Sequence, residues 1–314
     1  MPENGKKLIT VAVPVYNELP MLDEVVRRTG EVLRTLDAYD YEIVFFDDGS
    51  TDGSREKIAA LAEADRHVKA VFYSRNFGYS RSIFYCMQQA KGDCAVLLHA
   101  DLQNPPELIP EFVRRWENGS GAVVGVKNKS RENKFMYFLR GVFYWLMNVV
   151  FGMRLVPHAT DFELLDRDFL EMLRASDFKA PFLRGIIAEY GRNIEYVYYT
   201  QDKRAAGKSK FNLGKYYDFA VGGIVSASRK LPRRILCVGL VCMLASVLEF
   251  LIHYLPAMIA GGMKHVATGL YVRGGFLLLA LLTCFAAILG EFVIAAASAA
   301  DRKPLVTEEK RIGY

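Results

Sequence analysis

The stretch YEIVFFDDGSTDGS (residues 41–54) joins a strand pattern to a turn pattern. Its β-branched and aromatic first half predicts a buried strand over 41–48, and the Gly, Ser and Asp residues that follow are typical of a turn. A helix is expected near 53–64, with Ser50 or Asp52 as its cap. A buried strand that passes through a polar turn into a helix is the repeating unit of α/β folds.

The same unit recurs on both sides of this stretch. Upstream, KLITVAVPV (7–15) predicts a strand, and an amphipathic helix is expected from about Pro20 to Leu36. Further strands are expected over 68–74, 93–100 and 121–127, with helices at about 79–90 and 106–117. This alternation predicts an α/β fold with a mostly parallel sheet covered on both faces. Ligands of such sheets bind at the carboxyl ends of the strands.

The composition changes after about residue 230. Of the 314 residues, 52% are hydrophobic and 24% are charged, which excludes a disordered chain. No Lys or Arg occurs in the 29 residues 235–263 or in the 27 residues 274–300, and each stretch exceeds the roughly 20 residues that cross a bilayer as a helix. We therefore expect a soluble domain followed by a two-helix membrane anchor.

Positive charge flanks this predicted anchor, within 229–234 before it and within 302–311 after it. The positive-inside tendency places both flanks and the large domain in the cytoplasm, as a multi-pass protein of the inner membrane. Nucleic-acid binding is not expected, because the basic residues cluster at the membrane edges. The N-terminus has no apolar signal-peptide core. The expected units are a globular domain (1–210), a juxtamembrane amphipathic helix (211–234), the two-helix anchor (235–300) and a cytoplasmic tail (301–314).

Residues 135–153 form a second apolar region that is too short to span a bilayer. Arg140 interrupts the run, and about 13 residues remain before Arg154. An ordinary core helix and a helix that lies on the membrane surface both fit this pattern.

Polar residues follow the first two expected strands. Pro14-Val15-Tyr16-Asn17-Glu18 ends the first, and Asp47-Asp48-Gly49-Ser50-Thr51-Asp52-Gly53 ends the second. A carboxylate at a strand end can accept hydrogen bonds from a base or a ribose, and a tyrosine ring can pack on a base. When Asp48 is considered alone, simple turn chemistry is the favoured explanation.

A third polar cluster, His99-Ala100-Asp101-Leu102-Gln103-Asn104, follows the apolar run CAVLL. If the strand continues through this cluster, alternation points His99, Asp101 and Gln103 in one direction. A carboxylate, an imidazole and an amide oxygen together can hold Mg²⁺ or Mn²⁺ beside a diphosphate. The structural alternative makes Asp101 a helix cap and His99 a buried core histidine.

Together these clusters resemble a known family. The chain is similar to family 2 inverting glycosyltransferases of the GT-A fold, and specifically to polyisoprenyl-phosphate glycosyltransferases such as bactoprenol glucosyltransferases and dolichol-phosphate mannose synthases. The matching stretches run in order from end to end: VPVYNE (13–18), DDGSTDGS (47–54), RNFG (75–78), ADLQNPPELIP (100–110), TDFELLDR (160–167), FLRG (182–185), KRAAGKSKF (203–211) and GEF with RKPL (290–305).

The resemblance implies a role for each matching position. It assigns the nucleotide to Pro14, Tyr16, Glu18 and Asp48, and the diphosphate with its metal to Ala100, Asp101 and Gln103, with His99 as a further metal ligand. Asp161 matches the aspartate beside the acceptor, and Lys127 faces the diphosphate. Arg204, Ser209 and Lys210 match a loop that closes over phosphates, with Asp101, Asp161, Arg204 and Lys210 in the catalytic set. For Asp161, the spacing fits a helix cap equally well.

The implied reaction moves one sugar from a nucleotide-diphosphate sugar, with a UDP-sugar expected and GDP-mannose still open, to a lipid such as undecaprenyl phosphate. Mn²⁺ or Mg²⁺ with the basic side chains would stabilise the leaving diphosphate. Three positions depart from the family pattern: His99 replaces the first aspartate of D-x-D, Glu163 replaces an arginine, and Tyr79-Ser80-Arg81 replaces Lys-Glu-Ala.

These departures keep a second interpretation open, in which the chain is a catalytically impaired membrane scaffold or the partner of a flippase. A processive polysaccharide synthase is disfavoured, because Arg114-Arg115-Trp116 lacks the glutamine of Q-x-x-R-W. Ionisable residues inside the predicted spans, Glu249, His253 and Glu291, favour contacts between helices or subunits, and hence a homo-oligomer such as a tetramer.

Overall fold

The computed structural model describes residues 5–128, 141–142, 144–150, 154–178, 181–200 and 304–314, and, in the region between, residues 252, 274–275, 278, 281–282, 285–286 and 288–296. Arg204, Ser209, Lys210 and the juxtamembrane segment 211–234 lie outside the described residues, as does most of the anchor expected over 235–300. None of the helices within the described residues combines the length and the apolar character needed to cross a membrane.

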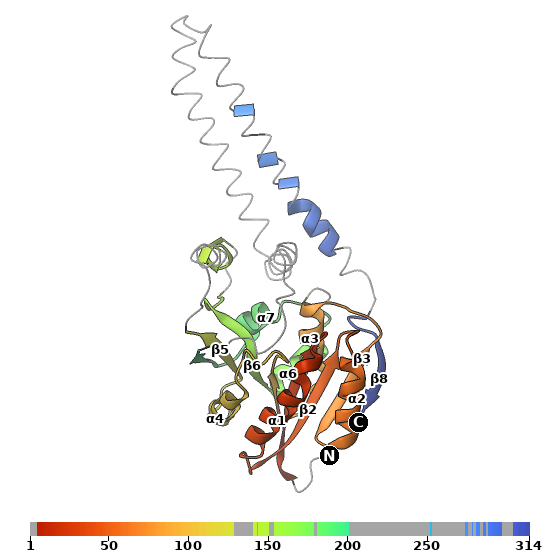
Figure 1. The fold of residues 1–314 in the computed structure, drawn as a ribbon. Helices are drawn as coiled ribbons and strands as arrows, with labels where there is room; N and C mark the ends of the chain where they lie inside the picture. The colour runs from red at the N-terminus through yellow and green to blue at the C-terminus, as the bar shows by residue number, and fades with distance from the viewer. Residues whose placement is uncertain are drawn as a thin grey trace, which may run out of the picture.

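An eight-stranded sheet forms the centre of the domain (Figure 1). Its strand order is β7-β5-β6-β4-β1-β2-β3-β8, and β6 and β8 run antiparallel to the other six. The predicted α/β fold with a mostly parallel sheet is therefore confirmed. The strands are β1 (Lys7–Val15), β2 (Tyr39–Asp47), β3 (Val68–Tyr73), β4 (Cys94–Leu97), β5 (Ala122–Lys127), β6 (Ala159–Asp166), β7 (Ile194–Tyr199) and β8 (Glu308–Ile312).

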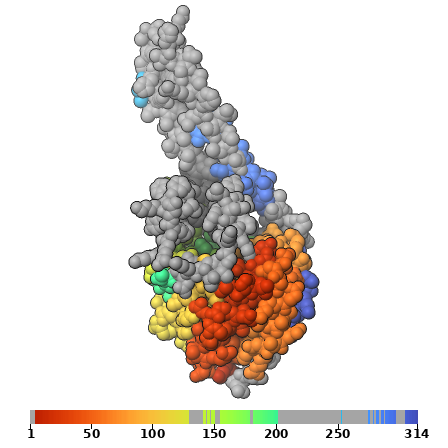
Figure 2. Space-filling view, viewed as in Figure 1, coloured from red at the N-terminus to blue at the C-terminus, as the bar shows by residue number. Residues whose placement is uncertain are grey.

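Helices cover both faces of the sheet, because the apolar side chains of its strands alternate between the two faces. Val11 and Val13 pack in one hydrophobic cluster with α1, α2 and α4, whereas Ala12 belongs to the opposite cluster with α3, α6 and α7. Figure 2 shows the first face, where the red surface of the N-terminal residues lies between yellow and orange surfaces. The helices are α1 (Leu22–Leu33), α2 (Ser54–Ala64), α3 (Tyr79–Gln89), α4 (Ile109–Glu117), α6 (Arg167–Ala175) and α7 (Leu183–Tyr190).

The segment 301–314 was expected to be a tail, and the structure corrects this for its described part. Glu308–Ile312 forms β8, which pairs antiparallel with β3 at the edge of the sheet (Figure 1). The sequence EEKRI has four charged residues in five and no strand-like apolar alternation, which explains why the pattern analysis missed it. Charged residues are common on edge strands, where they oppose pairing with other chains.

The described part of the apolar region 135–153 has two different sides. Tyr144 and Met147 are buried, whereas Val142, Trp145 and Val149 are exposed by 43%, 58% and 57%. Of the two interpretations left open above, this two-sided distribution favours a helix that packs on the domain and presents apolar side chains outward.

Candidate functional site

The loops that follow β1 and β2 are joined by hydrogen bonds between side chains and backbone. Asn17, which has a positive φ of 56°, donates its N–H to Ser50 Oγ at 2.8 Å and accepts from the N–H of Thr51 at 2.7 Å. The N–H of Glu18 donates to Ser54 Oγ at 3.1 Å. The first two polar clusters therefore form one structural unit at the carboxyl edge of the sheet. The N-cap residue of α2 is Gly53, and not Ser50 or Asp52 as expected from the sequence.

Asp48 is 3% exposed and holds the loop that follows β3. Its two carboxylate oxygens accept hydrogen bonds from the N–H groups of Phe77, at 2.7 Å, and Gly78, at 3.1 Å. Burial raises the pKa of Asp48 to about 6, although these two hydrogen bonds act in the opposite direction. A carboxylate has about four lone-pair sites, so each oxygen retains capacity for a ligand as well.

Gly49 permits the close approach of this loop to β2. Its φ is +72°, and a Cβ at this position would lie 2.7 Å from the backbone nitrogen of Asn76 and 2.8 Å from the carbonyl carbon of Arg75. Only glycine combines this backbone conformation with so little space. The segment Arg75–Gly78 therefore depends on Gly49 for its position next to Asp48.

Asp161 lies at the centre of a buried polar network. The guanidinium of Arg184 in α7 donates two hydrogen bonds to its carboxylate, Nε to Oδ1 at 2.5 Å and Nη2 to Oδ2 at 2.7 Å. The hydroxyl of Tyr79, the first residue of α3, donates to Oδ2 at 2.5 Å. The Tyr79 hydroxyl also lies 3.3 Å from His99 Nε2, and the two rings are stacked. Residues from β6, α3, α7 and the loop after β4 therefore meet at one carboxylate.

The charge states of this network follow from its partners. Burial raises the pKa of Asp161, but the charge and hydrogen bonds of Arg184 outweigh this effect and hold the pKa below its ordinary value. Burial lowers the pKa of His99, which favours the neutral imidazole. Burial and the Asp161 charge raise the pKa of the Tyr79 hydroxyl, so it remains a donor. The arrangement is a buried carboxylate anion with one full positive charge beside it.

The direction of β6 explains how Asp161 reaches this edge. Because β6 is antiparallel to β4 and β5, its first residues lie beside the carboxyl ends of those strands, with Glu163 opposite Leu97 and Ala159 opposite Val126. The alternative that Asp161 caps a helix is wrong. Asp166 is the cap of α6, and its Oδ1 accepts from the N–H of Phe169 at 2.8 Å.

Glu163, the departure noted above, is a buried carboxyl two residues beyond Asp161. It is 0% exposed, and neither of its oxygens has a hydrogen-bond partner among the described residues. It borders a cavity of ≈ 30 Å³ that Arg184, Tyr144 and apolar side chains also line. Burial and the nearby Asp161 charge raise the pKa of Glu163 well above its ordinary value, which favours the protonated form of this carboxyl beside an ionised Asp161.

Asp101 lies in the turn that follows β4, where its Oδ1 accepts from the N–H of Gln103 at 3.2 Å. The next residue, Leu102, has a φ of 51°, and buried Asn104 accepts a hydrogen bond from the hydroxyl of Tyr199 at 2.5 Å. This fixes the turn against β7. Within the described ranges, no three His, Cys, Asp or Glu side chains are grouped as a metal site.

The other candidate residues lie along the same edge. Pro14 is near the end of β1, and Tyr16, just after it, is 38% exposed. Ala100 is buried beside His99, and Lys127 ends β5.

Sequence reasoning did not assign site roles to Tyr79 and Arg184, although they supply three of the hydrogen bonds to Asp161. Arg184 belongs to the FLRG motif, which was noted without a role, and Tyr79 follows RNFG directly. The available signal for these two residues was the position of their motifs: RNFG follows β3 and leads into α3, and FLRG begins α7.

Comparisons with known proteins agree with this geometry. The family model described as glycosyl transferase family 2 matches residues 10–191. The uncharacterized glycosyltransferase YkcC of Bacillus subtilis (strain 168) is 34% identical over 222 residues, which cover 70% of this chain and 68% of the relative. Bactoprenol glucosyl transferase of Shigella phage SfV is 33% identical over 224 residues, which cover 70% and 72%.

Among solved structures, the chain is similar to glucosyl-3-phosphoglycerate synthase from Mycobacterium tuberculosis in complex with uridine diphosphate. The TM-score is 0.50 at 18% identity, with 73% of this chain and 80% of that chain covered. This likeness concerns the fold, and it supports the GT-A type of α/β fold that the sequence predicted.

Replacing Glu163 by glutamine tests the protonation of this buried carboxyl. The pKa of Glu163 is higher in the folded chain than in the unfolded chain. Its contribution to stability is therefore complete below the ordinary pKa of 4.5 and is lost as the pH rises through the folded-state pKa. The glutamine of Glu163→Gln cannot ionise, so the unfolding midpoint of the variant should fall less than that of the parent chain between pH 5 and pH 8. Each kcal/mol of unfolding free energy that the parent chain loses should separate the two midpoints by about 2–4 °C. Thermal unfolding followed by circular dichroism measures this, and identical pH slopes for the two proteins would contradict the assignment.

Proposed function

The chain belongs to glycosyl transferase family 2, and on this premise we propose that it transfers one sugar from a nucleotide-diphosphate sugar to a polyprenyl phosphate in a membrane, with inversion at the anomeric carbon. Relatives that are 33% identical over 70% of this chain are named bactoprenol glucosyl transferase, which supports a lipid acceptor. The observation that carries the proposal is the buried Asp161 carboxylate, paired with Arg184 at the edge where the Asp48 and Asp101 loops end.

The donor nucleotide occupies the joined loops after β1 and β2. The ring of Tyr16, which is 38% exposed, packs against the base, and Pro14 and Glu18 lie on either side of Tyr16 in the chain. Asp48 uses its remaining lone pairs to accept from the base or the ribose, and the N–H groups of Phe77 and Gly78 keep its carboxylate in place. We take a UDP-sugar as the donor.

A divalent cation, Mn²⁺ or Mg²⁺, accompanies the diphosphate. The donor set fits such an ion, because Mg²⁺ is commonly bound by one or two carboxylates together with substrate phosphates and needs no complete protein cage. Asp101 and Gln103 would hold it, with His99 next to them. When bound, such an ion would supply positive charge to stabilise the leaving diphosphate. Lys127 contributes further positive charge, as do Arg204 and Lys210, with Ser209, from the segment outside the described residues.

The acceptor side contains Asp161. A phosphate monoester has a second pKa of about 6, so a lipid phosphate is largely ionised at neutral pH and needs little help from a base. Asp161, with its lowered pKa, is a weak base and is better suited to orienting groups than to removing a proton. It fixes Arg184 and Tyr79 where the acceptor approaches.

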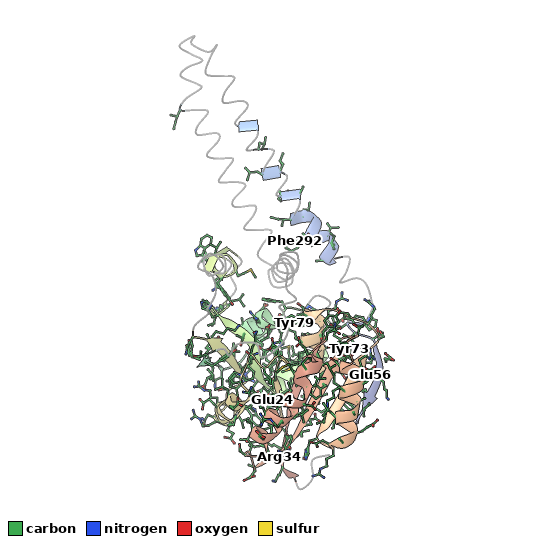
Figure 3. The ribbon with its side chains drawn as sticks, in the orientation of Figure 1. Glu24, Arg34, Glu56, Tyr73, Tyr79 and Phe292 are labelled. Carbon is green, nitrogen blue, oxygen red and sulfur yellow. The ribbon has the colours of Figure 1, made fainter. Side chains whose placement is uncertain are left out.

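A membrane location agrees with the apolar side chains that are exposed on two groups of described residues. Val142, Trp145 and Val149 are exposed on the described part of 141–150. Leu282, Phe285, Leu289 and Val293 are 48–60% exposed on described helical residues. Figure 3 shows that Phe292, within the described helical residues 288–296, lies beyond the end of the domain at which Tyr79 is found. We propose a multi-pass inner-membrane protein, a homo-oligomer, whose domain lies in the cytoplasm and whose site is close to the lipid headgroups.

The Gly49→Ala variant tests the donor loop. Its Cβ would displace the Arg75–Gly78 backbone that supports Asp48, so we expect the KM for the nucleotide sugar to rise about tenfold, as for the loss of one charge-assisted hydrogen bond. Gly119→Ala is the matched control, because Gly119 also has a positive φ, of +94°, but nothing lies within 4 Å of its added Cβ. Both variants should lose stability through backbone strain. An equal donor KM in the two variants would refute a role for this loop in binding.

The Asp101→Ala variant tests the metal assignment. We expect a UDP-sugar with Mn²⁺ to raise the thermal unfolding midpoint of the detergent-purified parent chain, and we expect this shift to be lost in the variant. Glu107→Gln is the control on the same segment, since Glu107 pairs with Arg28 at 2.7 Å and is not one of the proposed metal ligands. An undiminished Mn²⁺-dependent shift in Asp101→Ala would exclude this carboxylate as a ligand.

Transfer of radiolabelled sugar from UDP-sugars to undecaprenyl phosphate tests the proposed reaction. The parent chain should catalyse it, and Asp161→Asn should lower kcat by about 10²–10³-fold because the charge that fixes Arg184 is gone. Asp168→Asn, an exposed position in the first turn of α6, serves as the control. No transfer by the parent chain from any common sugar nucleotide would favour the impaired scaffold instead.

A further inference from the structure

The β8 segment, which we define as residues 304–314, is attached to the donor side of the domain by more than its strand pairing. The pairing joins Ala70 to Ile312 and Tyr73 to Glu308. Beyond the end of β3, the N–H of Ser74 donates to the carbonyl oxygen of Thr307 at 3.0 Å, and the two hydroxyls are also 3.0 Å apart. Val306 is 5% exposed within the hydrophobic cluster under α3.

Side chains of β8 also reach the helix that follows the loop. Tyr85 of α3 donates its hydroxyl to Glu308 Oε1 at 2.6 Å. Arg311 donates to Glu308 and, at 2.7 Å, to the side-chain oxygen of Gln89 at the end of α3. The β8 segment thus contacts β3, which precedes the loop Ser74–Gly78, and α3, which follows it.

A third connection runs to β2. Arg55 of α2 donates to Glu309 at 2.7 Å and to the carbonyl oxygen of Tyr73 at 3.1 Å, and it lies 3.6 Å from Asp47. The loop held in this way is the one whose N–H groups bind Asp48 and whose next residue, Tyr79, donates to Asp161. The donor carboxylate and the catalytic network therefore share one support.

We propose that the β8 segment is a positioning element for the donor site, which fixes the Ser74–Gly78 loop and through it Asp48. The expected change in KM rests on the proposed function, whereas the position of the loop does not. Most of its side-chain contacts are partly exposed hydrogen bonds and ion pairs of modest strength, so the segment is expected to detach locally at lower cost than the rest of the sheet. The affinity for the nucleotide sugar then depends on the β8 segment, whose residues lie more than 200 positions after Asp48 and the Ser74–Gly78 loop in the chain.

The test compares Glu308→Ala with Lys310→Ala in the full chain. Glu308 is the acceptor for both Tyr85 and Arg311, whereas Lys310 is exposed on the same strand. We expect Glu308→Ala to speed amide hydrogen exchange of Ser74–Gly78 and to raise the donor KM by about 3- to 10-fold. Lys310→Ala should change neither quantity.

Tyr85→Phe is a milder second variant that removes one hydroxyl, and it should change the same two quantities in the same direction if Glu308→Ala fails to fold. Unchanged exchange of Ser74–Gly78 and an unchanged donor KM in the folded variants would overturn the proposal. A parent chain that transfers no sugar would refute the proposed function, and the exchange experiment would still decide whether β8 fixes the loop.

Discussion

A carboxylate removed from water must be matched by donors, and Asp161 meets this requirement with three hydrogen bonds from two helices. The pairing dictates much of the surrounding structure. It fixes α7 through Arg184, and the start of α3 through Tyr79. Because α3 begins next to the N–H groups that hold Asp48, the position of one carboxylate is coupled to the position of the other. The two ends of the candidate site are thus parts of one packed arrangement.

The two antiparallel strands are the second constraint. In an entirely parallel sheet, a strand begins at the edge opposite the ligands, and its first residues lie far from them. The reversed direction of β6 brings its first residues, including Asp161, to the ligand edge, and the reversed β8 begins at that same edge beside Ser74. Glu163 follows from the same geometry, since it points to the face of β6 that Asp161 occupies, and burial together with the Asp161 charge raises its pKa.

The parallel half of the fold was predictable because its strands are apolar runs that end in polar turns. The strands β1 to β5 and the helices α1 to α4 lie close to the ranges expected from the sequence. β8 was missed because its charged residues lack the alternation of a strand, and its stability comes from contacts with residues distant in the chain. The Asp48 and Asp101 loops were located correctly at strand ends. The roles of Tyr79 and Arg184 were not assigned, because a motif at the start of a helix does not reveal which buried carboxylate that helix start will face.

The most direct test is a structure of the full chain with a UDP-sugar and Mn²⁺. The account predicts that the nucleoside lies against Tyr16 and Asp48, with the diphosphate beside Asp101 and the sugar directed toward Asp161. A nucleotide bound away from the carboxyl edge of the sheet would contradict it.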